Sequence, residues 1–364
     1  YDQFGFQDST YNPYSGGVKY IYNAFGELVS QKDAKNQSVI FNYDVLGRVV
    51  TTASPEGITS YFYYTDGNGI RQLSGISSPG NVSESYSYDT LGRLETFSKS
   101  IQNQIQMNYS FGYDTYGNNI SMTYPTGLEL VNVYDNNGYL TEIKKPDGYS
   151  IGKLNNLRAT GMPSNYTLGY NTLNLDKQFN YNSFENLTEI KTGNWQQIYN
   201  FDDTTGNLMS RSYKDLTNPS TLKTETFQYD GLDRLRYAQV TGQQLQEINY
   251  NPSGNIISKS GLGNYTYDQS KTNSLLNVGN TEQLISSTAQ NIQYNYHNKP
   301  DLITEGVLEY SLIYGADNQR IKSTLKNNST EIRTMFYGPA MKRLSRQILH
   351  GRVAIYQAHM VLKQ

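Results

Sequence analysis

The residue types that most often carry catalysis are scarce in this 364-residue chain. It has no cysteine, and its three histidines are His297, His350 and His359. This composition argues against cysteine nucleophiles, thiolate zinc sites and histidine-rich metal sites. The neighbouring carboxylates Asp202 and Asp203 could form an acid–base pair or hold a metal ion. They fall within a recurring turn motif, however, where an Asp ordinarily bonds to the backbone. We therefore expect no catalytic and no metal-binding residue.

Two glycine-containing stretches share only part of the pattern of a ligand-binding loop. Residues 67–69 read Gly-Asn-Gly, but the Lys-Ser/Thr pair that follows a phosphate loop is missing. Asp66, Asp147 and Gly148 lack the spaced acidic ladder of an EF-hand calcium loop. We expect turns at these positions and no bound cofactor.

The overall charge and hydropathy exclude several classes of protein. Thirty Lys and Arg nearly balance 32 Asp and Glu, which gives a formal net charge of −2. A nucleic-acid binder that follows phosphates needs a clustered positive surface, so we expect no nucleic-acid partner. No apolar stretch approaches the roughly 20 residues of a membrane-spanning helix, and the mean hydropathy is −0.66. The unusual feature is the 34 Tyr, which require an architectural explanation.

An internal repeat accounts for much of the tyrosine. A unit of the form Tyr-Asp/Asn-x-x-Gly-x-Leu recurs along most of the chain, and Tyr1, Tyr22, Tyr43 and Tyr64 are spaced by 21 residues. We expect the Tyr and Gly of the clearest copies to be the architectural positions. They are Tyr22, Gly26, Tyr43, Gly47, Tyr88, Gly92, Tyr113, Gly117, Tyr134, Gly138, Tyr229, Tyr250 and Gly254.

Each repeat reads as a β-hairpin. A second aromatic residue often stands two positions before the Tyr, as Phe41 does before Tyr43, and this spacing puts two rings on one face of a strand. The Asp or Asn can accept a hydrogen bond from a backbone amide two residues on, and Gly supplies the positive φ of a tight turn. The following Leu, Ile or Val begins the returning strand.

Copies without Gly, and the irregular stretches, give further expectations. Asn318 and Asp233 tolerate the left-handed region, whereas Glu185 and Pro300 predict another turn type or a bulge. Phe201 and Asp202 begin a copy with one inserted residue. We interpret residues 151–168 and 271–293 as longer surface loops, in preference to binding loops.

Such short repeats bury little surface alone and must stack on their neighbours. Tyr suits a pleated sheet and can leave its hydroxyl in water. Because aliphatic residues are few, we expect a wide curving antiparallel sheet without a thick two-layer core. The Tyr rings can pack against rings on neighbouring strands. The alternative is that exposed Tyr faces stack on sugars.

Three copies resemble a known family closely. Residues 43–49 read YDVLGRV, residues 88–94 read YDTLGRL and residues 229–235 read YDGLDRL. They are similar to the YD repeats of Rhs (rearrangement hotspot) proteins, which also occur in bacterial insecticidal toxin complexes, wall-associated bacterial proteins and animal teneurins. The resemblance implies an all-β fold, in which a YD-repeat strip of antiparallel β-hairpins curls into part of a hollow spiral shell. In bacterial members the shell encloses a C-terminal toxic domain, and in teneurin-like members it supports cell–cell adhesion.

One family feature is missing from the sequence. Bacterial shells end in an Asp-Pro-x-Gly-type motif associated with aspartate-dependent self-cleavage, and this chain contains no Asp-Pro dipeptide. No autoprotease residue can therefore be assigned. We expect residues 1–338 to form a YD-repeat β-shell segment and residues 339–364 to form a basic tail, a truncated beginning of the Rhs core region. In that tail Met341, Leu344 and Ile348 have the spacing of a short amphipathic helix.

The sequence therefore predicts a structural protein and no enzyme. The first hypothesis is a shell segment of an Rhs-type polymorphic toxin, which encapsulates and helps deliver a C-terminal effector. The alternative is a cell-surface adhesion or carbohydrate-binding YD-repeat module. The expected partners are the rest of the shell and a toxin cargo, with a secretion-system or cell-surface partner as a further option. The expected location is secreted or on the bacterial surface, although no signal is visible in the chain.

Overall fold

The computed structural model describes residues 1–12, 16–103, 105–170, 173–269, 273, 275–280, 282, 290–338 and 361–362. These residues form an all-β antiparallel fold, and none of them lies in a helix. No helix in this part of the chain is therefore long and apolar enough to cross a membrane. The predicted helix and most of the predicted basic tail at 339–364 lie outside the described residues.

The chain divides into two compact units, which are treated separately below. Unit 1 comprises Tyr1–Leu130, Thr288–Leu344 and Ile355–Gln364, and unit 2 comprises Val131–Ser287 and Ser345–Ala354. The strands of unit 1 are β1 (Ser9–Asn12), β2 (Gly16–Tyr22), β3 (Leu28–Lys32), β4 (Ser38–Tyr43), β5 (Val49–Ser54), β6 (Gly57–Tyr63), β7 (Leu73–Ser78), β8 (Val82–Tyr88), β9 (Leu94–Ile101), β10 (Ile105–Tyr113), β11 (Asn119–Thr123), β26 (Gln290–Tyr294), β27 (Pro300–Glu305), β28 (Leu308–Tyr314), β29 (Arg320–Asn327), β30 (Thr330–Phe336) and β31 (Val361–Leu362). The boundary falls within β12 (Glu129–Tyr134). Unit 2 continues with β13 (Leu140–Lys144), β14 (Ser150–Leu157), β15 (Pro163–Tyr170), β16 (Leu173–Tyr181), β17 (Leu187–Thr192), β18 (Trp195–Phe201), β19 (Leu208–Asp215), β20 (Asn218–Tyr229), β21 (Leu235–Val240), β22 (Gln246–Tyr250), β23 (Ile256–Lys259), β24 (Gly263–Tyr267) and β25 (Leu275–Val278).

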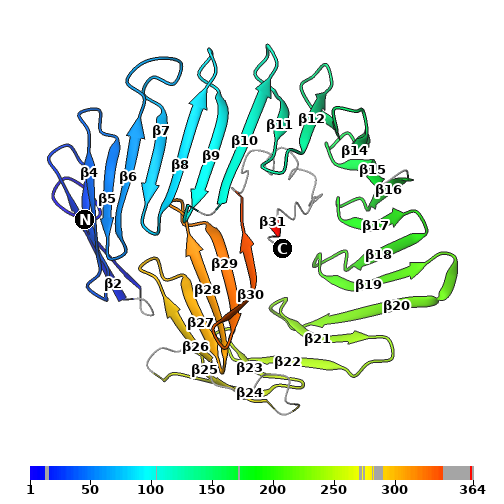
Figure 1. The fold of residues 1–364 in the computed structure, drawn as a ribbon. Coiled ribbons are helices and arrows are strands. Elements are labelled where there is room, and N and C mark those ends of the chain that lie inside the picture. The colour runs from blue at the N-terminus through cyan, green and yellow to red at the C-terminus, as the bar shows by residue number, and fades with distance from the viewer. Residues whose placement is uncertain are drawn as a thin grey trace. The chain divides into compact units, whose positions relative to one another are not determined.

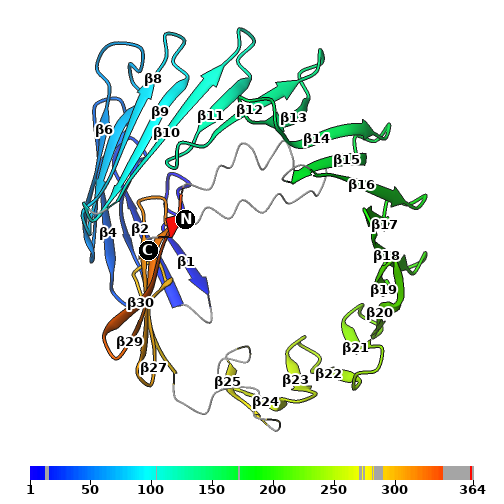
Figure 2. The ribbon, with the colours of Figure 1, turned by 45° about the vertical axis from the view of Figure 1, so that its right-hand side comes forward.

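Strands β1 to β25 belong to one sheet and β26 to β31 to a second. Strands that follow one another in the sequence pair antiparallel, as β4 does with β5 and β5 with β6. Figures 1 and 2 both show β6, β8, β9 and β10 of unit 1 side by side in sequence order. In such a meander every second connection falls on the same edge of the sheet.

The repeat occupies one of these two edges, which we call the repeat edge. Every even-numbered strand from β2 to β28 ends at the repeat Tyr or its counterpart, which is Leu157 in β14 and Phe201 in β18. Most of the following odd-numbered strands begin at the Leu, Ile or Val of the motif, as β3 does at Leu28. The register shifts by one residue just before the repeat Tyr, for example between Asn42 and Tyr43, so these hairpins carry a β-bulge.

Several predictions about the irregular stretches are wrong in whole or in part. Within residues 271–293, Leu275–Val278 form β25, which pairs with β24, and β26 begins at Gln290. Residues 151–168 are not a long loop, because β14 and β15 form a hairpin closed by a bond from the Arg158 amide to the Met162 carbonyl. Glu185 adopts the left-handed region at φ 65° in the same turn as the other copies, so the alternative of another turn type is wrong, whereas a bulge is present between Asn180 and Tyr181 as in the other hairpins. Pro300 is not the glycine position at all, since Asn298 has the positive φ and Pro300 begins β27. Asn318 and Asp233 take the left-handed conformation, as predicted.

Unit 1 has a two-layer core, contrary to the expectation of a single sheet. Ile321 of β29 and Phe336 of β30 are buried together with side chains of the first sheet. The other buried members are Val82, Phe97, Ile101, Met107, Tyr109, Met122 and Tyr124. The Lys322 ammonium also donates to Gln102 Oε1 at 2.6 Å, and Figure 1 shows β28 to β30 in orange beside β8 and β9. The repeat pattern alone gave no sign of this packing.

A buried ion pair lies beside this core. Lys99 of β9 and Glu84 of β8 are directly opposite each other, and their side chains meet at 2.7 Å with exposed fractions of only 3% and 9%. The Tyr86 hydroxyl also donates to Glu84. The turn between β28 and β29 approaches the pair, because a Cβ added to Gly315 would lie 3.5 Å from Lys99 Nζ.

Candidate functional site

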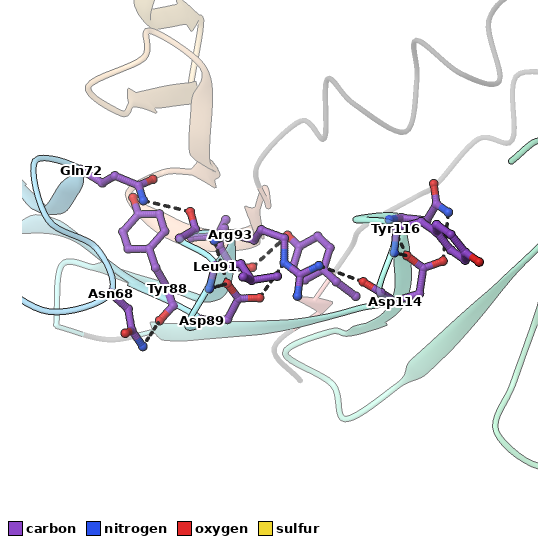
Figure 3. Close-up of polar contacts among 12 residues, drawn as sticks. Asn68, Gln72, Tyr88, Asp89, Leu91, Arg93, Asp114 and Tyr116 are labelled. Carbon is purple, nitrogen blue, oxygen red and sulfur yellow. Dashed lines mark hydrogen bonds and ion pairs between the residues drawn. The ribbon is translucent and has the colours of Figure 1, made fainter.

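The repeat turn is built around one carboxylate or amide side chain. Asp89 Oδ1 accepts hydrogen bonds from the amides of Leu91 and Arg93, both at 2.9 Å, and Figure 3 shows this arrangement. The main chain closes the same turn, with the Asp89 amide donating to the Arg93 carbonyl and the Gly92 amide to the Asp89 carbonyl. The predicted Asx-turn is therefore confirmed. Asn makes the same two bonds in other copies, as Asn182 does with the amides of Phe184 and Asn186.

The glycines at these turns have the conformation that the sequence predicts. Gly26, Gly47, Gly92, Gly117, Gly138 and Gly254 all have positive φ, between 73° and 89°. At Gly47 the restriction is also steric, because an added Cβ would lie 3.0 Å from Glu27 Oε1 of the preceding turn. A β-branched residue is strongly disfavoured in this region of φ.

In most copies the repeat Tyr links its hairpin to the one before it. The Tyr88 hydroxyl donates at 2.9 Å to the carbonyl of Leu73, the first residue of β7. Equivalent bonds join Tyr43 to Leu28, Tyr63 to Val49, Tyr113 to Leu94, Tyr181 to Pro163, Tyr229 to Leu208, Tyr250 to Leu235, Tyr267 to Ile256 and Tyr314 to Pro300. Tyr22 donates instead to the Gln7 carbonyl, and Tyr134 ends β12.

These bonds correct two expectations about tyrosine. The repeat hydroxyls named above are bonded to the backbone and are not left to water. The fourth evenly spaced Tyr was also misplaced by one residue, since Tyr63 occupies the repeat position and Tyr64 takes the place of the Asp. The Tyr64 hydroxyl reaches forward to the Tyr86 carbonyl at 2.9 Å. Burial raises the pKa of Tyr88, so its hydroxyl remains a protonated donor at neutral pH.

In three copies an Arg stands directly after the Gly position and links its turn to the next one, a role that the sequence analysis missed. Arg93 Nε donates to Asp89 Oδ2 at 2.7 Å, and its Nη1 donates to the Asp114 carbonyl in the next repeat turn at 2.9 Å. Its guanidinium carbon lies 4.7 Å from the centre of the Tyr113 ring, within the range of a cation–π contact. Arg48 and Arg234 repeat this arrangement over the rings of Tyr63 and Tyr250. The signal in the sequence was the recurrence of Arg at this one position.

Copies without the standard residues are joined by other polar contacts. Arg158 stands at the Asp position of its turn and pairs with Glu185 of the next repeat turn at 3.1 Å. Asn207 similarly donates to Asp233 at 2.7 Å. These contacts explain why a Glu tolerates a positive φ at position 185, because its side chain is held by the neighbouring turn.

The turn carboxylates have the electrostatics of structural groups. The hydrogen bond from Arg234 lowers the pKa of Asp230 to about 2. The hydrogen bond from Thr204 similarly lowers the pKa of Asp202 to about 2, and the amides of Thr204 and Thr205 also donate to it. Asp202 therefore acts as a turn acceptor. Among the described residues no group of three His, Asp or Glu side chains is placed to hold a metal ion.

Comparisons with known proteins agree with this geometry. A family model described as RHS Repeat matches residues 22–59, which run from the end of β2 into β6. A crystal structure of TcdB2-TccC3 without its hypervariable C-terminal region is similar to the chain with a TM-score of 0.63 at 14% identity, over 91% of this chain and 20% of that one. A crystal structure of TcdB2-TccC3-TEV is similar with a TM-score of 0.59 at 13% identity, over 89% and 20%. No curated protein sequence matches. The chain thus spans about a fifth of the solved structures that it resembles.

Proposed function

We propose, on the premise that this chain is a YD-repeat protein of the Rhs type, that it forms a wall segment of an Rhs-type polymorphic toxin. The wall encloses a C-terminal effector and helps to deliver it. The observation that carries this proposal is the two-way linkage along the repeat edge. In the described part of the chain, nine repeat Tyr, Tyr88 among them, bond to the preceding hairpin, and Arg48, Arg93 and Arg234 bond to the following one.

This linkage suits a wall better than an active site. Repeat arrays are stabilised by contacts between nearest neighbours, so the strip can be extended without a separate core for each repeat. The polar groups of the turns are used to close the turns and to join them, and a container needs no catalytic residue. The similarity in fold to the TcdB2-TccC3 structures supports this assignment.

The expected partners and location follow from the same proposal. The rest of the wall and an effector are the direct partners, and a secretion-system or cell-surface partner serves delivery. The protein acts outside the cytoplasm, secreted or at the bacterial surface. We expect residues 1–338 to form the wall segment and the basic residues 339–364 to form the beginning of the Rhs core region.

The decisive experiment starts from the genomic reading frame. We expect the sequence downstream of this chain to encode an Asp-Pro-x-Gly core followed by a toxin domain. In the purified full-length protein, that domain should resist limited proteolysis until the repeat strip is unfolded. Variants Gly47→Val and Gly92→Val, which disturb the wall alone, should expose it to protease earlier. A membrane anchor or wall-sorting segment downstream would contradict the proposal, and so would a toxin domain that is cleaved as rapidly in the native protein as in isolation.

The second candidate function is a surface adhesion or carbohydrate-binding module. One specific observation favours it, namely the exposed aromatic side chains on β18 and β19 in unit 2.

A further inference from the structure

Aromatic side chains on neighbouring strands are buried in one part of the protein and exposed in another. In unit 1, Phe97 and Tyr109 are only 6% and 4% exposed, because they lie in the core shared with the second sheet. In unit 2, Trp195 of β18 and Tyr213 of β19 are 53% and 48% exposed. Their ring centres lie 6.4 Å apart with an angle of 39° between the planes. The pair forms an apolar platform open to solvent, which is a feature of interaction sites.

Polar side chains are placed beside this platform by the strand register. Gln197 of β18 and Lys223 of β20 are both directly opposite Tyr213, and one row away Tyr199 and Glu225 are both opposite Arg211. Residues opposite one another share a face of the sheet, as do residues two apart along a strand. The platform and these side chains therefore lie on one face.

This face carries a small cavity of about 220 Å³. Its lining includes Gln197, Tyr199, Arg211, Tyr213 and Glu225. Two guanidinium nitrogens of Arg211, Nε and Nη2, hold Glu225 Oε2 at 2.6 Å. The Tyr199 hydroxyl donates to Gln197 Oε1 at 2.9 Å, so the polar groups are held in position by one another. The volume is below the roughly 300–1,000 Å³ of sites for drug-sized ligands, and it suits a single ring.

We infer that the face of β18–β20 binds one pyranose ring of a neutral glycan. The apolar C–H face of a sugar matches the exposed rings of Trp195 and Tyr213, which combine an apolar body with a polar group. The sugar hydroxyls match a guanidinium, a carboxylate and an amide, which supply both donors and acceptors. Glu225 occupies Nε and Nη2 of Arg211, so this guanidinium is not free to bind a sugar carboxylate in a bidentate way, and Lys223, which also lines the cavity, can donate to sugar hydroxyls. This site goes beyond the wall function, since it uses side chains of the sheet face and none of the turns.

The chain contains a built-in reporter for this site. Trp195 is its only Trp, so any change in tryptophan emission reports on this platform. We expect methyl pyranosides to change the emission saturably, with a dissociation constant of about millimolar for one ring. A glycan array should show selective binding of neutral oligosaccharides. The change Arg211→Ala or Tyr213→Ala should weaken binding at least about ten-fold, whereas Tyr213→Phe, which keeps the ring, should retain it.

The matched control is Tyr116→Ala, which removes an exposed aromatic from a repeat turn of unit 1 and should leave binding unchanged. Far-ultraviolet circular dichroism of each variant establishes that the sheet is intact. The inference is overturned if neither the emission nor the array detects a sugar, or if Tyr213→Phe and Tyr213→Ala bind equally well. Binding confined to charged glycans and abolished by salt would also overturn it. Each of these results leaves the wall proposal untouched, because that proposal is tested on the full-length protein.

Discussion

The buried pair of Lys99 and Glu84 gives a sharp test of what stabilises unit 1 around its core. The perturbation is Lys99→Met, which keeps an unbranched side chain one atom shorter and removes its charge. The Glu84 carboxylate, whose side chain is 9% exposed, then loses its cationic partner and keeps the hydrogen bond from the Tyr86 hydroxyl. Removing one partner of a buried ion pair costs about 3–5 kcal/mol, because the other charge is no longer compensated. Because Tyr86 still donates a hydrogen bond to Glu84, we expect a loss of stability at the lower end of this range, about 3 kcal/mol.

The matched comparison is the double variant Lys99→Met/Glu84→Gln. Gln keeps an oxygen acceptor for Tyr86 and carries no charge, so no uncompensated charge remains. Replacing both members of a buried pair by neutral groups is often close to neutral in stability. We therefore expect the double variant to lie within about 1 kcal/mol of the parent protein.

The assay is native-state hydrogen exchange followed by mass spectrometry, because a chain with two units need not unfold in a single step. A cost of about 3 kcal/mol predicts roughly hundred-fold faster exchange for amides of β8, β9 and β29. Peptides from β18 to β20 in unit 2 serve as the internal reference. The reasoning is refuted if Lys99→Met accelerates exchange less than about ten-fold, or if the double variant exchanges as fast as the single one.

Three further predictions concern the repeat turns. Gly47→Val should lower the free energy of unfolding by about 1–2 kcal/mol in urea denaturation, because it forces a β-branched residue to φ 75°. Gly47→Asn should be tolerated, since Asn318 adopts the same region of φ in its own turn. Equal stability of the two variants would contradict the turn geometry. Tyr88→Phe should cost about 1 kcal/mol through loss of the bond to the Leu73 carbonyl, measured in the same way, and an unchanged midpoint would show that this bond contributes nothing. The pKa of Asp230 is lowered to about 2 in the fold, below its usual value of about 3.9, so the stabilisation is complete above pH 4 and is lost as pH falls toward 2. Thermal melting between pH 7 and pH 2 should show this loss, and Asp230→Asn should reduce it; a parent protein equally stable at pH 2 and pH 7 would refute the assignment.

The sequence predicts the hairpins well because the chemistry of the turn is local. An Asp such as Asp89 bonds to amides two and four residues on, and Gly92 needs nothing distant to adopt its φ. The same locality explains the error at Tyr63 and Tyr64, since two adjacent Tyr leave the position within the motif ambiguous. The hairpin at residues 151–168 was missed because Leu157 and Arg158 replace the Tyr and Asp, although Gly161 was present.

What the sequence could not predict depends on contacts between distant segments. Nothing in the repeat pattern places Ile321 and Phe336 against Ile101, because that packing joins residues more than 200 positions apart. The left-handed Glu185 likewise depends on Arg158 in the neighbouring turn. The platform at Trp195 is a further case, since its exposure is decided by what the rest of the unit covers. Whether the Tyr and Gly of the motif are the main architectural determinants stays a prediction, which the variants above will test.

The direction of the tyrosine bonds has a consequence for how the protein is made. Tyr43 and Tyr88 each bond to a carbonyl 15 residues earlier in the chain. A hairpin emerging from the ribosome therefore finds its acceptor already synthesised, and the strip can grow one hairpin at a time through contacts of low sequence separation. The second sheet of unit 1 is the exception, because Lys322 bonds to Gln102, 220 residues before it. We therefore expect the first 11 strands of this unit to add one after another during synthesis, whereas its core can be completed only after residues 131–287 of unit 2 have been made.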